Sequence, residues 1–142
     1  MNMLKFVTIG FLLLEAANVL ILYFNPGSKY ANGVGVFNAW EKSKRDPEVH
    51  KFVVYLVNWV AGTKLIFILL LVVILYTATD QSLLWMGIAM TVSIVSFFWR
   101  LFPLIRSMDR ENQIDPRNYS MVLAGMIMAV IALFLIGTLL AI

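Results

Sequence analysis

Four long apolar segments constrain the fold of this sequence more than any other feature. They cover roughly residues 4–24, 52–77, 83–104 and 119–142. A helix needs about 20 apolar residues to cross a hydrocarbon core of about 30 Å. Helices are expected because each helix satisfies its own backbone hydrogen bonds in lipid. We therefore predict an all-α membrane protein, a four-transmembrane-helix bundle that forms a single domain over residues 1–142.

The composition agrees with a membrane protein and excludes several other classes. Of the 142 residues, 61% are hydrophobic and 13% are charged, whereas a soluble domain is typically about half apolar and a quarter charged. The chain has no cysteine and a single histidine, His50. Disulfides, thiolate catalysis and metal sites built from cysteine or several histidines are therefore excluded. The expected partner is the lipid bilayer, and the mixed charges of the last linker argue against nucleic acid.

The basic residues predict how the segments are oriented in the membrane. Apart from Lys5 and Lys64, they lie in the linker after the first segment or around the linker before the last segment. These residues are Lys29, Lys42, Lys44, Arg45, Lys51, Arg100, Arg106, Arg110 and Arg117. Because basic loops stay in the cytoplasm, we predict both linkers inside and both termini on the non-cytoplasmic side. The membrane would be the inner membrane of a prokaryotic cell or the endoplasmic reticulum of a eukaryotic one.

Two ionisable side chains fall inside the apolar segments. Glu15 lies in the middle of the first segment with Asn18 on the same helical face, and Lys64 lies in the second segment. An unpaired charge at the bilayer centre costs at least about 2.5–3.5 kcal/mol, so one interpretation pairs Glu15 with Lys64. In the other interpretation Glu15 is protonated and the long stem of Lys64 reaches toward the headgroups. The sequence leaves both interpretations open.

The third segment carries a polar line made of Ser93, Ser96 and Arg100. Serines in a membrane helix either pack against neighbouring helices or face a ligand, whereas the guanidinium of Arg100 suits an anionic ligand or a lipid phosphate. Pairs of small residues at the ends of 87–91 and 125–129 indicate close helix contacts, within or between subunits. The polar residues and the small residues could therefore serve helix packing or ligand binding.

Residues 46–124 resemble the MAPEG family, the membrane-associated proteins in eicosanoid and glutathione metabolism. That family carries a DPxVxR stretch followed by Asn-x-x-Glu at the start of the second helix. Here "DPEVHK" begins at residue 46, and Asn58 falls at the spacing of the family asparagine. The segments "FFWR" and "DPRNYSMVLA" supply Arg100 and Arg117 at the positions of two family arginines. The glutamate of Asn-x-x-Glu is replaced by Ala61.

The resemblance implies a homo-oligomer, a trimer of four-helix subunits, with a ligand site between neighbours that opens to the cytoplasm and the lipid. It implies glutathione as the ligand and Arg117 as the catalytic residue that stabilises the thiolate, since a nearby cation favours the charged form of a thiol. Asn58, Arg100, Arg106 and Tyr119 are the implied ligand-binding residues. The arginines that the family places ahead of Asn58 are valines here, so the sequence lacks part of the family's glutathione site, and no cofactor is evident from the residues themselves.

Three functions follow from these patterns. The first is a MAPEG-like protein that binds a lipophilic or anionic small molecule or a lipid at the cytoplasmic side, with or without transferase activity that uses glutathione or another thiol. The second is a small transporter or channel that uses the charges of Glu15 and Lys64. The third is a non-catalytic subunit of a membrane complex, since the sequence contains no recognisable catalytic set.

Overall fold

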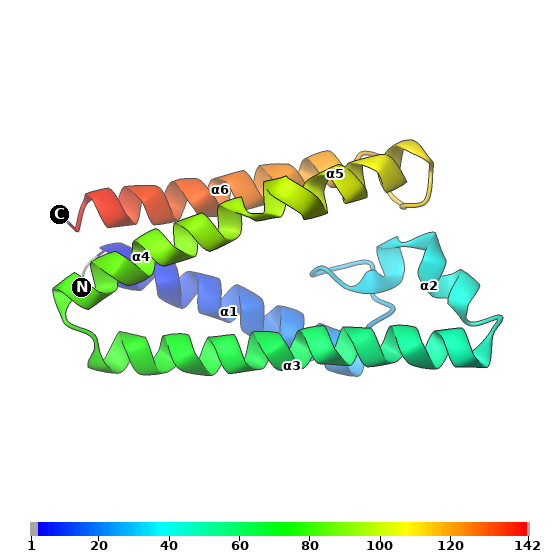
Figure 1. The fold of residues 1–142 in the computed structure, drawn as a ribbon, viewed down its shortest axis with the longest axis horizontal. Coiled ribbons are helices and arrows are strands. Elements are labelled where there is room, and N and C mark those ends of the chain that lie inside the picture. Colours follow the sequence, from blue (N-terminus) through cyan, green and yellow to red (C-terminus); the bar gives the residue numbers. More distant parts are fainter. Residues whose placement is uncertain (1–2, 142) are drawn as a thin grey trace.

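The computed structural model describes residues 3–141, and all its regular elements are helices (Figure 1). In chain order they are α1 (Met3–Phe24), the 3₁₀ turn η1 (Val34–Val36), α2 (Asn38–Ser43), α3 (Pro47–Thr77), α4 (Asp80–Val95), α5 (Phe97–Arg110) and α6 (Tyr119–Leu139). Four helical stretches are long and apolar enough to span a membrane, with α4 and α5 together making one of them. The predicted all-helical fold with four apolar helices is confirmed, although residue 142 of the last predicted segment lies outside the described residues.

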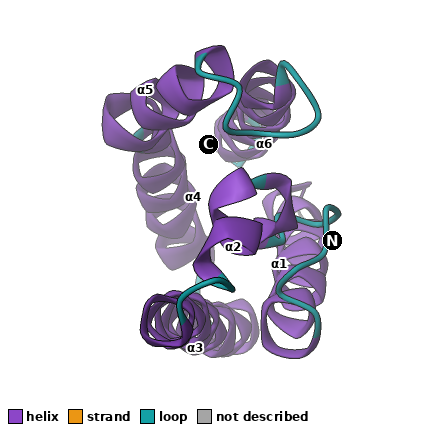
Figure 2. Ribbon diagram, turned by 90° about the vertical axis from the view of Figure 1, so that its right-hand side faces the viewer, coloured by secondary structure: helices purple, strands orange, loops and turns teal. Residues whose placement is uncertain are grey.

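The long helices surround a common interior, and they pack more closely at one end of the bundle than at the other. Helix α1 packs against α3 and α6, and α6 packs against α4. The chain ends and the α3–α4 turn lie together at one end of the bundle, which we call the terminal end (Figure 1). At the opposite end α2 lies across the middle of the bundle (Figure 2). We call residues 25–46, which carry η1 and α2, the cap, and we call that end of the bundle the cap end.

Helix α3 begins earlier than the sequence predicts, for a local reason. Helix α3 begins at Pro47 rather than near residue 52, because the Asp46 carboxylate accepts hydrogen bonds from the backbone N–H groups of Glu48 and Val49. An aspartate cap followed by proline in the first turn is a strong start signal for a helix. The polar first turn of α3 thus extends beyond its apolar part at the cap end.

The third apolar segment is divided rather than continuous. Helix α4 ends at Val95, and α5 begins at Phe97 after a break at Ser96. The Ser96 hydroxyl donates to the carbonyl of Ser93 at 2.6 Å, and such back-bonds bend helices. Pro103 lies inside α5 and removes a further backbone donor. The break lets α5 follow α6 while α4 descends toward the α3–α4 turn (Figure 1).

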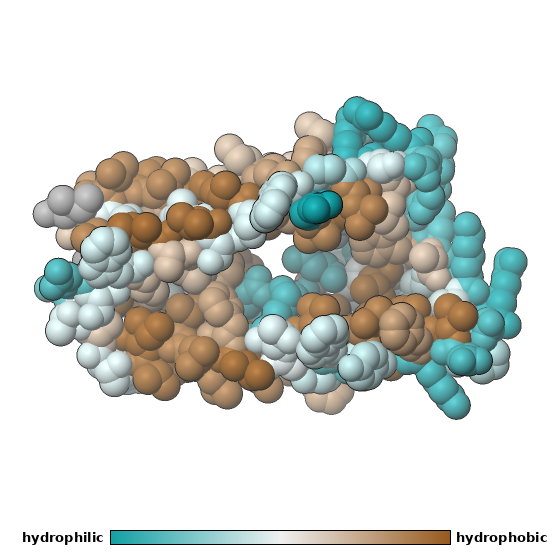
Figure 3. All heavy atoms as spheres, viewed as in Figure 1, coloured by the Kyte–Doolittle hydropathy of each residue, from teal (hydrophilic) through white to brown (hydrophobic). Residues whose placement is uncertain are grey.

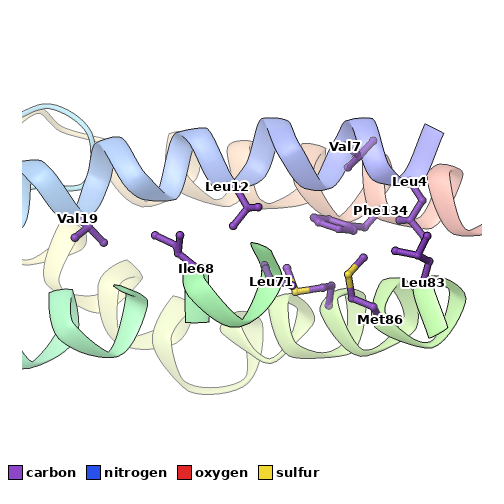
Figure 4. Packing of buried hydrophobic residues seen from close by; sticks show 10 residues of the cluster. Leu4, Val7, Leu12, Val19, Ile68, Leu71, Leu83, Met86 and Phe134 are labelled. Carbon is purple, nitrogen blue, oxygen red and sulfur yellow. The ribbon is translucent and has the colours of Figure 1, made fainter. Parts of the chain in front are cut away.

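The main apolar core fills the terminal half of the bundle. Its buried members come from α1, α3, α4 and α6 and include Leu4, Leu12, Leu71, Leu83 and Phe134 (Figure 4). The helices approach closely there. A Cβ added at Gly87 of α4 would collide with the hydroxyl oxygen of Thr138 and press on Leu4, so the small residue at 87 marks a close contact within the subunit. Gly125 has no heavy atom within 4 Å of the equivalent position.

The cap is attached to the link between α5 and α6, residues 111–118. Phe37 pairs with Ile114 in an isolated antiparallel bridge, and Lys29 forms a salt bridge of 2.6 Å with Asp115. The hydrogen bond to Asp115, with the carboxylate charge, raises the pKa of Lys29 above its ordinary value. A Cβ at Gly35 would collide with the backbone carbonyl oxygen of residue 27, so the cap folds back on itself as only glycine allows there.

Candidate functional site: a charge pair beside a lateral hollow

Glu15 and Lys64 face the interior of the bundle. Glu15 lies on the α1 face that also carries the buried residues Asn18 and Leu22, and Lys64 lies on the α3 face that carries Ala61. Residues three, four and seven apart share one side of a helix. The structure brings the two charges together, with Lys64 Nζ 2.6 Å from Glu15 Oε2. An ion pair therefore joins α1 to α3 on the face that each helix turns toward the interior of the bundle.

The charge pair is not sealed in the core. The side chain of Glu15 is 21% exposed and that of Lys64 is 29% exposed. An ammonium group has three donors and a carboxylate has about four lone-pair sites, and one hydrogen bond between the two groups leaves most of these unused. The pair can therefore bind a third polar group without being broken.

Asn18 places a further polar group one turn from Glu15. Its Nδ2 donates to the carbonyl oxygen of Ala31 in the cap, and the residue is only 4% exposed. Its Oδ1 is buried and has no hydrogen-bond partner among the residues that the structure describes. A buried amide oxygen left without a partner is costly.

A hollow opens on one side of the bundle between α3 and α4–α5. At the cap end the apolar core divides into two small clusters, one around Val57 and Ala61 on α1–α3 and one around Ile105 and Leu123 on α5–α6. The cap bridges them, because Val34 packs with the first cluster and Val36 belongs to the second. Figure 3 shows the hollow between α3 and α4–α5, with hydrophilic atoms behind its opening.

An apolar groove continues from the hollow toward the terminal end. It lies between α3 and α4, has a volume of about 580 Å³, and is lined by Phe67 and Leu71 from α3 and by Met86, Met90 and Ser93 from α4, among others. Since Phe67 is three residues after Lys64 on α3, the groove begins about one helical turn from the charge pair. A second groove of about 550 Å³ lies between α1 and α6, and the residues that line it are apolar.

Arg106 belongs to a network that joins α5 to α6. Its guanidinium donates to the Ser120 hydroxyl at 3.2 Å, and that hydroxyl donates to Asp109 at 2.5 Å. The Asp109 carboxylate also accepts from the backbone N–H groups of Asn118 and Ser120. Asp109 therefore satisfies donors at the start of α6, where helical N–H groups have no partner within the helix. The position of Arg106 has a structural explanation in this network.

The other predicted binding residues are spread over the surface. Asn58 is exposed on α3, and Arg117 is exposed in the α5–α6 link; neither side chain has a hydrogen-bond partner among residues 3–141. Arg100 lies 5.9 Å from the ring of its neighbour Trp99. The Tyr119 hydroxyl donates a long hydrogen bond of 3.4 Å to Asn32. Asn58 lies on α3, Arg100 on α5 and Tyr119 at the start of α6.

Sequence reasoning missed Asp109 as the group that holds the start of α6. Its partners are nine and eleven residues away across an irregular link, and no short local motif announces such a contact. Reasoning from the sequence also did not separate Ser93 from Ser96. The Ser96 hydroxyl bonds back to the end of α4, whereas Ser93 lines the α3–α4 groove, and this difference depends on the helix break at Ser96.

The described chain has four helical stretches that are apolar enough to cross a bilayer, as in an integral membrane protein. An ion pair lies between two of these helices, inside the bundle. No family model, no curated protein and no solved structure matches this chain.

Proposed function

We propose that this membrane protein binds a lipophilic molecule with a polar end, such as a lipid, in the hollow between α3 and α4–α5. The observation that carries the proposal is the charge pair inside the bundle, whose two side chains stay 21% and 29% exposed. Ionisable groups within membrane spans are costly and mark binding or transport sites by default. The hollow beside the pair supplies access from the membrane (Figure 3).

The same proposal places the site toward the cytoplasmic side. Two exposed aromatic residues on α3, Trp59 and Tyr76, are about 26 Å apart along the helix, close to the spacing of the two aromatic belts of a membrane protein. Lys64 would then lie about 8 Å inside the level of Trp59. The basic cap next to that level supports a cytoplasmic location for the cap end, with both termini on the other side.

The MAPEG resemblance adds a more specific proposal about assembly. In a trimer, the exposed and unpaired side chains of Asn58 and Arg117 would be free to bind an anionic ligand such as glutathione between neighbouring subunits. Light scattering of the protein in mild detergent tests the trimer, and a monomeric mass would contradict it. Glutathione should raise the melting temperature of the wild type but not that of Arg117→Ala, and no shift in the wild type would remove glutathione as the ligand.

A co-purified ligand tests the main proposal. The protein is purified in mild detergent, and the molecules retained after washing are extracted and identified by mass spectrometry. We expect one lipophilic species per subunit in the wild type and a strongly reduced amount in Lys64→Met. The matched control is Lys51→Met, which removes an exposed lysine from the first turns of the same helix. Equal retention by both variants would contradict the proposal.

Transport is the second candidate, because the 2.6 Å Glu15–Lys64 pair is itself the observation that favours it. A carboxylate and an ammonium group that exchange partners during a cycle are typical of transporters and proton relays. Purified protein in liposomes should then show proton- or ion-coupled flux that Glu15→Gln abolishes. Equal flux in protein-containing and empty liposomes would reject transport while leaving ligand binding intact.

A further inference from the structure

The α3–α4 groove and the charge pair together specify the chemistry of a ligand more narrowly than the proposed function does. We infer that the site takes an uncharged lipid whose polar end is a hydroxyl group, held between Lys64–Glu15 and Ser93, with its apolar chain in the α3–α4 groove. This inference rests on the proposed function, because it names the class of molecule that would occupy the same hollow.

Ser93 is the first observation. Four threonine hydroxyls in the apolar helices, those of Thr8, Thr63, Thr77 and Thr91, donate to a carbonyl of their own helix four residues earlier. The hydroxyl of Ser93 makes no hydrogen bond within the described part of the chain, although its carbonyl accepts from the hydroxyl of Ser96. In a membrane a hydroxyl without a partner is unfavourable, and this one lines the groove.

The second observation is the relative level of Ser93 and Lys64. The two residues are equally far along the chain from the turn at Ala78 and Thr79 that joins α3 to α4. Both helices rise by the same amount per residue. The two residues therefore lie at similar heights along the bundle, Lys64 on the α3 side and Ser93 on the α4 side. Ser93 lines the mouth of the groove, and the charge pair lies about one helical turn beyond Phe67 at a similar height. A polar end would therefore stop near this level, and an apolar chain would begin there.

The third observation concerns charge. The Glu15–Lys64 pair has no net charge, so a ligand with a full charge would add an uncompensated ion to the membrane interior, at a considerable cost. A hydroxyl group accepts one hydrogen bond from Lys64 or Ser93 and donates one to Glu15 without adding charge. The pair thus favours an alcohol over a carboxylate or an amine of the same chain length.

The groove has the dimensions and lining of a site for one apolar chain. From the level of Ser93 to that of Ser82, at its other end, the groove runs for about 16 Å along α4. Its walls carry Met86 and Met90, whose unbranched side chains adapt to irregular apolar ligands. The groove between α1 and α6 has a similar volume, but all the described residues that line it are apolar. These described residues therefore offer no side-chain hydroxyl that could bind a polar end.

Three photoreactive probes of equal chain length test the inference: hexadecanol, palmitate and hexadecylamine, each with a diazirine at the end of the chain. The protein is reconstituted in nanodiscs, irradiated and digested. We expect hexadecanol to label α4 near Ser82 and Trp85 several-fold more than either charged probe. Ser93→Ala should lower that labelling about fivefold, the effect of one lost hydrogen bond, whereas the matched Ser96→Ala should leave it unchanged.

The outcomes separate the inference from the proposed function. Preferential labelling by palmitate or hexadecylamine that still depends on Lys64 would overturn the uncharged ligand class and keep the hollow as a binding site. Equal labelling of wild type and Ser93→Ala would also overturn the inference. Labelling by none of the probes, or labelling only at the α1–α6 groove, would reject the inference and, if no co-purified ligand is found either, the proposed function too.

Discussion

At the scale of single residues, the account depends on two charges that stabilise one another within a membrane. Glu15 and Lys64 share a short contact of 2.6 Å, yet a pair that excludes solvent completely would gain little over an apolar pair. Their partial exposure distinguishes them from a fully buried structural ion pair. The pair is therefore expected to behave as a unit, with the loss of one member costing more than the loss of both.

Glu15→Gln tests that expectation. The variant leaves the ammonium of Lys64 without its counterion, so the melting temperature in detergent should fall by several degrees, a loss of about 2–3 kcal/mol on the scale for an unpaired charge in a membrane helix. The double variant Glu15→Gln/Lys64→Met removes both charges and should recover most of that loss. An unchanged melting temperature in Glu15→Gln would show that the pair contributes nothing to stability.

At the scale of helices, two small-residue positions that look alike in the sequence differ in the structure. Gly87 lies where α4 meets Thr138 of α6 and Leu4 of α1, and an added Cβ would collide there. Gly125 of α6 has open space at the same position. The sequence pattern alone gives no basis for separating a contact within the subunit from an outward-facing position.

A matched pair of alanine variants measures that difference. Gly87→Ala should destabilise the protein by about 1–3 kcal/mol, as overpacking of a core does. Gly125→Ala should be neutral or stabilising, by up to about 1 kcal/mol, because alanine favours a helix more than glycine. Thermal unfolding in one detergent gives both values. Equal effects would contradict the packing described for α4, and a loss at Gly125 alone would place a subunit contact on α6.

The helices were more predictable than their ends and their breaks. Four apolar segments long enough to cross a bilayer are a composition signal that needs no tertiary information, and the structure has four such helices. The third segment is divided at Ser96, where the side-chain hydroxyl bonds to a carbonyl of the preceding turn. A serine within a helix does not always make this bond, so the sequence alone does not predict the division. The early start of α3 was readable in principle from "DP", an aspartate cap before proline.

The candidate site was only partly predictable for a different reason. Glu15, Asn18 and Lys64 could be identified singly, since ionisable and amide groups are rare in apolar segments. Which of them meet depends on which helices are neighbours, and the free hydroxyl of Ser93 depends on the geometry of one turn. Asn58 lies on α3, Arg100 on α5 and Arg117 in the α5–α6 link, and the site that the resemblance implies between subunits stays a prediction.

At the scale of the whole molecule, the two ends of the bundle are built differently. The terminal half contains the main core, whereas the cap end has two separate clusters bridged by the cap. The hollow between these clusters opens between α3 and α4–α5 (Figure 3), so the proposed ligand enters from the membrane. The proposed orientation, with the basic cap in the cytoplasm, follows from the distribution of lysine and arginine.

Cysteine labelling tests that orientation directly, because the chain has no cysteine of its own. Lys42→Cys introduces a single thiol into the cap, and Gln81→Cys introduces one next to the α3–α4 turn; both positions are exposed. In intact cells or sealed vesicles of known orientation, a membrane-impermeant maleimide should label Gln81→Cys from the non-cytoplasmic side. Lys42→Cys should react only after permeabilisation. The reverse pattern would invert the topology.

The central claim, that the interior charge pair holds a ligand, is tested most directly by the amount of ligand that the double variant Glu15→Gln/Lys64→Met retains. This variant should stay folded, because neither charge is left unpaired, so lost binding cannot be attributed to unfolding. Mass spectrometry of the purified proteins should find the lipophilic species in the wild type and little or none in the folded double variant. A folded double variant that retains as much of the same ligand as the wild type would contradict the account.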